Sequence, residues 1–401
     1  MATNIIKKIF RGAKPLDKAV YHYRNGGALE GHRVHLRIES NGSGVLVIDA
    51  DKILYLNQTA AEIVKYMLDG KNDEEIISDM LKRYRVAKET LNDDINALKH
   101  TIKGFAESTD IDPVTYLSSE DISMFTSGFS APHRMDLILS YEKCPLFMDF
   151  CFEHPLKEGL TFAQWKRVIE ILWNVGVPHI LFTGGEPTLF ANFMDLVRFG
   201  EEVGIVTGLL TNGEKLADTS YTNTLVEAGL DHIQITIQSH RREVHNELIG
   251  EDTWERTVKG LENALATPIY CVVHTTFTSK NKEDIPRFIS FLKEKGVYVF
   301  AGDALRKESV TKETTLALNE AEITEIVKRL SEETKKNGIS FVWYGEEKIS
   351  SEVKPSNIWE YSMCIEPNGD VTPCTFKYQP FGNILKDEWK AIWNKAIKYN
   401  R

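Results

Sequence analysis

The sequence predicts an α/β protein built around a barrel or half barrel of parallel strands. Six short apolar runs alternate with stretches of helical periodicity between residues 135 and 305. Strands that alternate with helices form parallel βαβ units with right-handed crossovers. Before residue 60 the pattern differs, because apolar and polar residues alternate across closely spaced turn signals. This second pattern predicts a separate small antiparallel sheet near the amino terminus.

The amino-terminal module is expected to span residues 33–108, after an extension of residues 1–32. Residues 33–56 form its sheet, with a turn signal at Asn41-Gly42. Apolar residues at helical spacing then predict two short helices joined at 69–72 and a third helix that follows them. Together these elements have the size of a winged helix. Residues 109–134, which contain two prolines and little periodicity, are expected to be a linker.

The barrel is expected to span residues 135–315. Its strands are predicted at the six apolar runs, 137–139, 179–182, 205–210, 233–237, 270–273 and 297–300. Helices are predicted at Phe162–Val175 and Asp284–Lys295. A long amphipathic helix, Glu320–Asn337, opens a last region, 316–401, in which Trp389 and Trp393 are expected to be packing anchors. In barrels of this kind, chemistry gathers at the carboxyl ends of the strands.

Composition excludes several classes of protein. The chain has 401 residues and a formal net charge of -10, which argues against nucleic acid or an anionic membrane as its main partner. It contains neither a membrane-length apolar run nor a signal-peptide pattern, so a cytoplasmic protein is expected. Its five cysteines are an odd number, which indicates reduced thiols. Cys271 lies within an apolar run and is expected to be a core thiol.

Motifs with chemical potential follow the first three barrel strands. Cys144 and Cys151 come after the first strand, Gly184-Gly185-Glu186-Pro187 after the second, and Thr211-Asn212-Gly213 after the third. Two cysteines that face glycine-rich loops on one rim suit a metal cluster beside an amino-acid-like ligand. The glycines let backbone groups approach a ligand closely, and a glutamate is able to accept hydrogen bonds from an ammonium group.

In their order along the chain, these motifs resemble those of radical S-adenosylmethionine (SAM) enzymes. That family carries C-x3-C-x2-C, Gly-Gly-Glu-Pro and often Thr-Asn-Gly after successive strands, and the similarity covers about residues 135–305. The resemblance implies a (β/α)6 partial TIM barrel that holds a 4Fe-4S cluster and SAM. It also implies an external electron donor and a 5'-deoxyadenosyl radical that abstracts hydrogen from a substrate. The implied cluster ligands are Cys144, Cys151 and the residue at position 148; the implied cofactor contacts are Gly184, Gly185, Glu186, Pro187, Thr211, Asn212, Gln238 and Ser239.

The middle ligand position of the cysteine motif is Met148. A neutral thioether is a poor substitute for a thiolate on iron. Three interpretations stay open: an inactive variant of an active enzyme, a natural relative that has lost the chemistry, and unusual ligation in which Met148, Asp149 or His154 supplies the third bond. A cluster-free barrel enzyme, such as a lyase, is a further alternative, with Glu153, Glu186 and His154 as its candidate residues.

The amino-terminal flanking segment, residues 52–70, is similar to PqqD-like modules. Such modules hold the leader of a ribosomally made precursor peptide as an added strand at a sheet edge. The alternative is a DNA-binding winged helix. It is disfavoured because residues 41–110 contain 13 acidic and 9 basic residues, an excess of negative charge that opposes binding to the phosphate backbone.

The carboxyl-terminal flanking segment, Glu366 to Cys374, resembles a truncated SPASM or twitch extension. It has too few cysteines for a complete auxiliary cluster, so no second cluster is expected. The sequence therefore predicts radical SAM modification of a precursor peptide. A non-catalytic peptide-binding relative is the alternative function.

Overall fold

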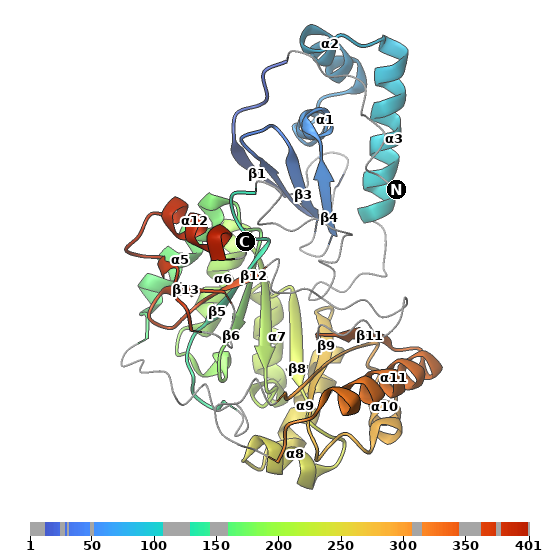
Figure 1. Cartoon of the computed structure of the whole chain (residues 1–401), viewed down its shortest axis with the longest axis vertical. Helices are drawn as coiled ribbons and strands as arrows, with labels where there is room; N and C mark the ends of the chain where they lie inside the picture. The colour runs from blue at the N-terminus through green and yellow to red at the C-terminus, as the bar shows by residue number, and fades with distance from the viewer. Residues whose placement is uncertain are drawn as a thin grey trace.

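The computed structural model describes residues 13–24, 29, 32–48, 52–106, 129–144, 159–306, 315–344, 362–373 and 378–399. Two sheets organise these residues: a four-stranded sheet, β1-β2-β3-β4, and a ten-stranded sheet, β11-β10-β9-β8-β7-β6-β5-β12-β13-β14. Figure 1 shows the smaller sheet and its helices seated at one end of the larger sheet. Within the described ranges, no helix combines the length and the apolar character that crossing a bilayer requires.

The amino-terminal module consists of β1 (Ala19–Arg24), β2 (Arg33–Ile38), β3 (Gly44–Ile48), β4 (Lys52–Leu56), α1 (Gln58–Leu68), α2 (Asp73–Arg83) and α3 (Lys88–Ala106). Neighbouring strands pair antiparallel throughout. Asn57 caps α1, and a capping box of Asn72 and Glu75 begins α2, which satisfies backbone N–H groups at both helix starts. The sheet and the three helices predicted from the sequence are all present. β1 is an addition, because no strand was expected within residues 1–32.

The barrel region alternates strands and helices, as predicted. Its elements are β5 (Arg134–Ile138), α5 (Phe162–Val175), β6 (His179–Thr183), α6 (Phe193–Val203), β7 (Val206–Thr211), α7 (Thr219–Glu227), β8 (His232–Thr236), α8 (Arg242–Ile249), α9 (Trp254–Leu265), β9 (Tyr270–Phe277), α10 (Ile285–Glu294), β10 (Val299–Ala304), α11 (Glu320–Asn337) and β11 (Ser340–Trp343). β5 to β10 lie side by side and parallel, in sequence order. This arrangement confirms the partial parallel barrel.

The large sheet continues past both ends of the six barrel strands. β11 pairs parallel with β10 at one side, and β12 (Ser362–Ile365) pairs parallel with β5 at the other. β13 (Asp370–Thr372) and β14 (Gly382–Asn383) then extend the sheet antiparallel, and α12 (Trp389–Tyr399) follows. β11 to β14 are therefore part of the barrel sheet.

The two predicted tryptophan anchors pack as expected. Trp393 is almost fully buried, and its indole N–H donates to the Phe129 carbonyl at 2.8 Å. The Trp389 indole donates to the Ser130 carbonyl at 2.9 Å. Both acceptors lie in the segment expected to be a linker, so α12 holds the end of that segment just before β5 begins.

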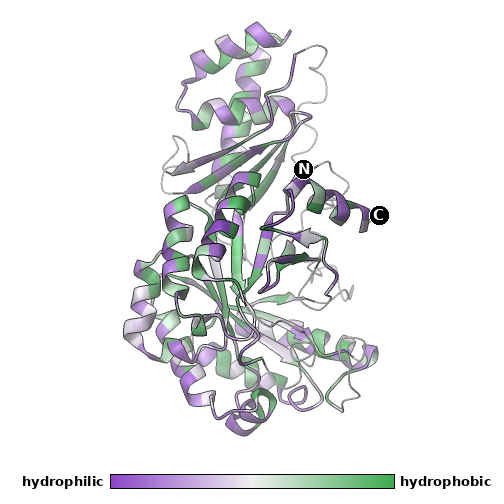
Figure 2. Ribbon diagram, turned by 90° about the vertical axis from the view of Figure 1, so that its left-hand side faces the viewer, coloured by the Kyte–Doolittle hydropathy of each residue, from purple (hydrophilic) through white to green (hydrophobic). Residues whose placement is uncertain are grey.

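Each barrel strand presents one face to the helices and the other to the barrel interior. Ile235, Cys271 and Phe300 belong to a large core cluster that includes residues of α5, α6, α7, α9, α10 and α11. Figure 2 shows this pattern as apolar positions along the strands and mixed polarity on the helices outside them. Cys271 is a buried free thiol, as predicted, and burial raises its pKa to about 12.

The amino-terminal module docks onto the amino ends of the barrel strands. Val45, Val47 and Ile53 share the core cluster of the barrel. Arg33 forms ion pairs with Glu201, at the end of α6, and with Asp231, just before β8. The carboxyl ends of the barrel strands, where the candidate motifs lie, are therefore at the far end of the barrel from this module.

Candidate functional site

The loops that follow β5 and β6 are in direct backbone contact. Ile138 aligns with Thr183 in the parallel register, and the Gly185 N–H donates to the Ser140 carbonyl at 2.8 Å. Gly184 has φ of +132°, in the region that favours glycine. The residues leading to Cys144 therefore lie directly on the Gly184-Gly185 turn.

Both glycines of this turn are required by the neighbouring loop. A Cβ atom added to Gly184 would lie 2.2 Å from the Ser140 carbonyl oxygen, and one added to Gly185 would lie 1.7 Å from the Glu142 carbonyl oxygen. The sequence hypothesis gave these glycines a role in letting a ligand approach. The structure adds a second reason for them, which is the close packing of one rim loop against the next.

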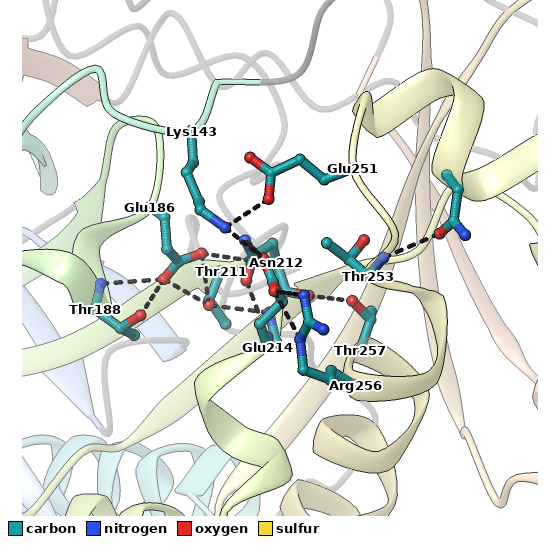
Figure 3. A network of polar contacts seen from close by, with 12 residues as sticks. Lys143, Glu186, Thr188, Thr211, Asn212, Glu214, Glu251, Thr253, Arg256 and Thr257 are labelled. Carbon is teal, nitrogen blue, oxygen red and sulfur yellow. Dashed lines mark hydrogen bonds and ion pairs between the residues drawn. The ribbon is translucent and has the colours of Figure 1, made fainter.

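Glu186 connects the loop after β6 to the end of β7 (Figure 3). Its side chain is buried, at 2% exposure, and accepts hydrogen bonds from the Thr188 N–H and hydroxyl, the Thr211 hydroxyl and the Asn212 N–H. Burial raises the pKa of Glu186, and these hydrogen bonds oppose that rise. The carboxylate that the sequence hypothesis offered to a ligand ammonium is thus already bonded within the protein.

Ion pairs connect the loop of Cys144 to the opposite side of the rim (Figure 3). Lys143 contacts Glu251 at 2.7 Å and Glu214 at 3.3 Å, and Glu214 also pairs with Arg256. The next residue, Cys144, is buried at 7% exposure. Sequence reasoning missed these pairs because their members are distant in the chain and belong to no motif.

Gln238 is the buried rim residue with unused hydrogen-bonding capacity. It follows β8 at 1% exposure, and neither atom of its amide group has a partner within the described residues. A buried polar group without a partner costs free energy, so a ligand that bonds to it would be stabilised there.

Ser239 has a different role from its neighbour. Its hydroxyl accepts from the Arg241 N–H at 3.1 Å, in the turn that leads to α8. Next to it, the Gln238 N–H donates to Nδ1 of His245, and burial lowers the pKa of His245 to about 4. A neutral histidine therefore fixes the backbone of this turn.

The carboxyl-terminal region braces the segment that carries the cysteine motif. Tyr141 donates a hydrogen bond to the Glu366 carboxylate, and Thr372 donates to the same carboxylate at 3.2 Å. On the other side of the motif, the Leu160 N–H donates to the Pro367 carbonyl at 2.7 Å. The carboxyl-terminal region thus contacts the chain on both sides of the motif.

Several predicted residues lie outside the described part of the chain: Met148, Asp149, Cys151, Glu153, His154 and Cys374. Cys364 is described and buried, on β12. Among the described residues, no three His, Cys, Asp or Glu side chains are grouped as metal ligands. Of the predicted iron ligands, the described structure therefore contains Cys144.

Three family models match successive parts of the chain. The Radical SAM superfamily matches residues 120–292, the coenzyme PQQ synthesis protein D (PqqD) family residues 44–102, and the SPASM iron-sulfur cluster-binding domain residues 357–401. The first match covers β5 to β9 and the rim motifs. The other two cover the flanking regions in which the sequence showed resemblances.

Curated relatives and solved structures agree with these matches. A GTP 3',8-cyclase of Chlorobaculum tepidum is 31% identical over 157 residues, which are 38% of this chain and 47% of the cyclase. A PqqA peptide cyclase of Rhizobium meliloti is 27% identical over 278 residues, which are 64% of this chain and 72% of that enzyme. The chain thus spans about half of the first relative's length and more of the second's.

The fold is shared with a solved structure over almost the whole chain. Streptococcus suis SuiB bound to S-adenosylmethionine has a TM-score of 0.64 at 18% identity, over 90% of this chain and 86% of SuiB. SuiB bound to the precursor peptide SuiA gives a TM-score of 0.62 at 17% identity, over 89% of this chain and 86% of SuiB. With the rim motifs in order on β5 to β7, this chain belongs to the radical SAM superfamily and carries a PqqD-like module before its barrel and a SPASM region after it.

Proposed function

We propose that this chain acts on a ribosomally made precursor peptide, which it binds through its PqqD-like module and presents to the barrel rim. The observation that carries the proposal is the presence of both parts in one continuous structure. Val45, Val47 and Ile53 of the module share the barrel core, so the module is fixed relative to the rim. Two similar proteins support a peptide substrate, since the Rhizobium meliloti relative is a PqqA peptide cyclase and SuiB has been solved with a precursor peptide.

The proposed place for the leader of the peptide is the outer edge of β4. β1 and β4 are the two edge strands of the small sheet, in which β2 and β3 are paired on both sides. An exposed strand edge offers backbone N–H and C=O groups to a further strand, and peptide-binding modules use this mode of recognition. Of the two edge strands in the described part of this sheet, β4 is the one that α1 follows directly in sequence.

The proposed SAM site lies at the carboxyl ends of β6 to β8. The backbone of Gly184 to Pro187 and the unpartnered amide of Gln238 would hold the cofactor, and the buried Gln238 amide is the structural observation that favours a polar ligand. When bound, SAM supplies the adenosyl radical chemistry of the superfamily. Glu186 would act through the backbone that it holds, because its carboxylate is bonded to Thr188, Thr211 and Asn212.

The proposed cluster site has an incomplete donor set. Cys144 is disulfide-bonded in this structure, contrary to the reduced thiols expected from the sequence. In the reduced chain, positions 144 and 151 would supply two thiolates and position 148 a thioether, whereas iron-sulfur clusters are held by thiolates. As it stands, this set does not fit a three-thiolate cluster. We therefore propose that the chain carries a disabled cluster motif and that Met148→Cys completes it.

Met148 also favours a second candidate function, which is peptide binding without chemistry. A chain that keeps its peptide module but lacks a complete cluster motif would still bind its peptide. The first candidate requires that the unaltered protein bind an iron-sulfur cluster, and the second requires that it does not. The disabled motif proposed above favours peptide binding without chemistry in the unaltered chain, with the cluster restored in Met148→Cys.

Iron binding is tested by anaerobic reconstitution of the unaltered chain and of Met148→Cys. We expect about four irons and four sulfides, with an electron paramagnetic resonance spectrum that shifts on adding SAM, only in Met148→Cys. Met194→Cys is the matched control, because it adds a thiol on the outer helix α6. Four irons and a SAM-dependent spectrum in the unaltered chain would contradict the disabled motif and would show that another ligand completes the cluster.

Peptide binding is tested separately, by fluorescence anisotropy with fluorescein-labelled peptides encoded by short reading frames beside the gene. We expect binding by both the unaltered chain and Met148→Cys, since the module is far from the rim. The same peptides without their amino-terminal halves are the control. If none of the peptides binds, the proposed substrate class is wrong.

A further inference from the structure

The inner face of the barrel carries a polar cluster on strands that no motif covers. Gln234 lies on β8, His274 on β9 and Asp303 on β10, and Tyr344 follows β11. The Tyr344 hydroxyl donates to the Gln234 side chain at 2.9 Å, and its ring stacks on His274 with centroids 5.6 Å apart. Nε2 of His274 lies 3.5 Å from Oδ1 of Asp303. Four side chains from four neighbouring segments thus form one connected group.

Strand alternation places this group inside the barrel. Ile235 and Val273 point toward the helices, where they belong to the large core cluster. Val272 and Ala301, of the opposite alternation, form a separate small cluster with the Tyr344 ring. His274 shares the alternation of Val272, and Asp303 shares that of Ala301. The polar group therefore lies on the interior face, closer to the carboxyl ends of the strands than the apolar cluster.

Asp303 differs in its charge partner from two other carboxylates of the barrel interior and rim, Asp136 and Glu214. Its side chain is 28% exposed, its contact within ion-pair distance is His274, and its Oδ1 is buried without a hydrogen bond among the described residues. By contrast, Asp136 on the inner face pairs with Arg134, and Glu214 on the rim pairs with Lys143 and Arg256.

A partly dehydrated carboxylate is stabilised when a cation with hydrogen-bond donors reaches it. Within the described residues, no lysine or arginine forms an ion pair with Asp303. The remaining exposed part of its side chain is available to a group that enters the barrel interior. A ligand cation that reaches this exposed part would pair with the carboxylate, which among the described residues has His274 as its contact within ion-pair distance.

We infer that Asp303, supported by His274, is a subsite for a cationic side chain, lysine or arginine, of the peptide substrate. This inference rests on the proposed function, because the peptide is the ligand that would enter the barrel. β9 and β10 follow β8 in the order of the sheet, and β8 is the last of the strands whose carboxyl ends carry the proposed cofactor contacts. The subsite would therefore select which residue of the peptide lies beside the cofactor.

The test uses the full chain and two small probes, N-acetyl-arginine methylamide and its uncharged counterpart, N-acetyl-citrulline methylamide. Dissociation constants are measured by ligand-observed nuclear magnetic resonance. We expect the unaltered chain to bind the arginine probe about tenfold more tightly, which is the size expected for a hydrogen bond to a charged group. Asp303→Asn should abolish this preference.

The control is Asp195→Asn, which removes an exposed carboxylate from the outer helix α6 and should keep the tenfold preference. Thermal melting shows whether the variants are folded, and Asp303→Ser is the second variant if Asp303→Asn is not. Equal binding of the two probes to the unaltered chain would overturn the subsite, as would a preference that persists in a folded Asp303 variant.

Failure of the subsite is distinguishable from failure of the proposed function. Anisotropy with the labelled precursor peptides is measured on the same samples. Intact peptide binding together with equal probe affinities overturns the subsite alone. A preference for arginine in a chain that binds none of the peptides supports the subsite and refutes the precursor-peptide substrate.

Discussion

A buried ion pair at the junction between the module and the barrel gives a sharp prediction about stability. Arg37 and Glu39 of the β2 region are 4% and 1% exposed, with Nε and Oε1 2.7 Å apart. Arg37 also donates to the carbonyls of Gly176, before β6, and Pro132, before β5. Burial lowers the pKa of Arg37, and Glu39 opposes that shift. One side chain thus joins the module to two barrel loops.

Removing one partner should cost far more than removing both. Arg37→Met leaves Glu39 as an unpaired buried charge, so the free energy of unfolding should fall by about 3–5 kcal/mol. In Arg37→Met/Glu39→Leu no charge is left unpaired, and replacing a buried pair by apolar residues is often neutral. The double variant still loses the bonds to Gly176 and Pro132, so we expect a net cost of about 1–2 kcal/mol.

The assay is urea unfolding followed by tryptophan fluorescence and by circular dichroism, because two probes reveal whether the module and the barrel unfold together. The control pair is Arg167→Met and Glu170→Leu, an exposed contact on α5 that should be worth less than about 1 kcal/mol. If Arg37→Met costs no more than the double variant, the pair does not hold the junction by charge compensation and the reasoning is wrong.

Three further predictions concern the rim and the core. Gly185→Ala should destabilise the protein by about 3 kcal/mol, since its Cβ would lie 1.7 Å from the Glu142 oxygen. The control, Gly104→Ala on α3, has open space around it and should stabilise the protein by about 0.5–1 kcal/mol. Urea unfolding measures both changes. Glu186→Gln should cost about 1–3 kcal/mol at neutral pH, because the Asn212 N–H loses its acceptor. Burial raises the pKa of Glu186, so its contribution to stability is full below its unfolded pKa and falls as pH rises through its folded pKa. Glu186→Gln should therefore flatten the dependence of stability on pH over that range. An unchanged dependence would argue against a raised pKa for Glu186. Cys271, with a pKa of about 12, should resist iodoacetamide at pH 8 until the chain unfolds, as mass spectrometry of its peptide would show.

The elements that local sequence signals define were predictable, in some cases to the residue. α5 spans Phe162–Val175 and α11 spans Glu320–Asn337, as expected. Each begins with a capping box and ends at a glycine in the left-handed region, so both ends are encoded within a few residues of the helix. The barrel strands were equally visible, because parallel strands buried on both faces appear as continuous apolar runs.

Elements defined by distant partners were not predictable. β1 has no strong apolar pattern, and it forms because β2 offers its edge to residues 19–24. Likewise, no strand was expected at residues 362–365, yet β12 pairs with β5, and Glu366 bonds to Tyr141 across 225 positions of sequence. These contacts depend on the topology of the whole sheet, which no window of sequence contains.

The candidate site contains residues of both kinds: some belong to a sequence motif, and others are brought together only by the folding of the barrel. Glu186 has the most recognisable position in the sequence, but its carboxylate is committed to Thr211 and Asn212. Asp303 and His274 belong to no motif, and they meet because the register of β9 and β10 makes them diagonal neighbours on the interior face. A motif is fixed by requirements common to a family, whereas the selection of a particular substrate depends on side chains that vary along the barrel interior. In this chain, substrate recognition should therefore be sought on β8 to β11, away from the motifs by which the family is identified.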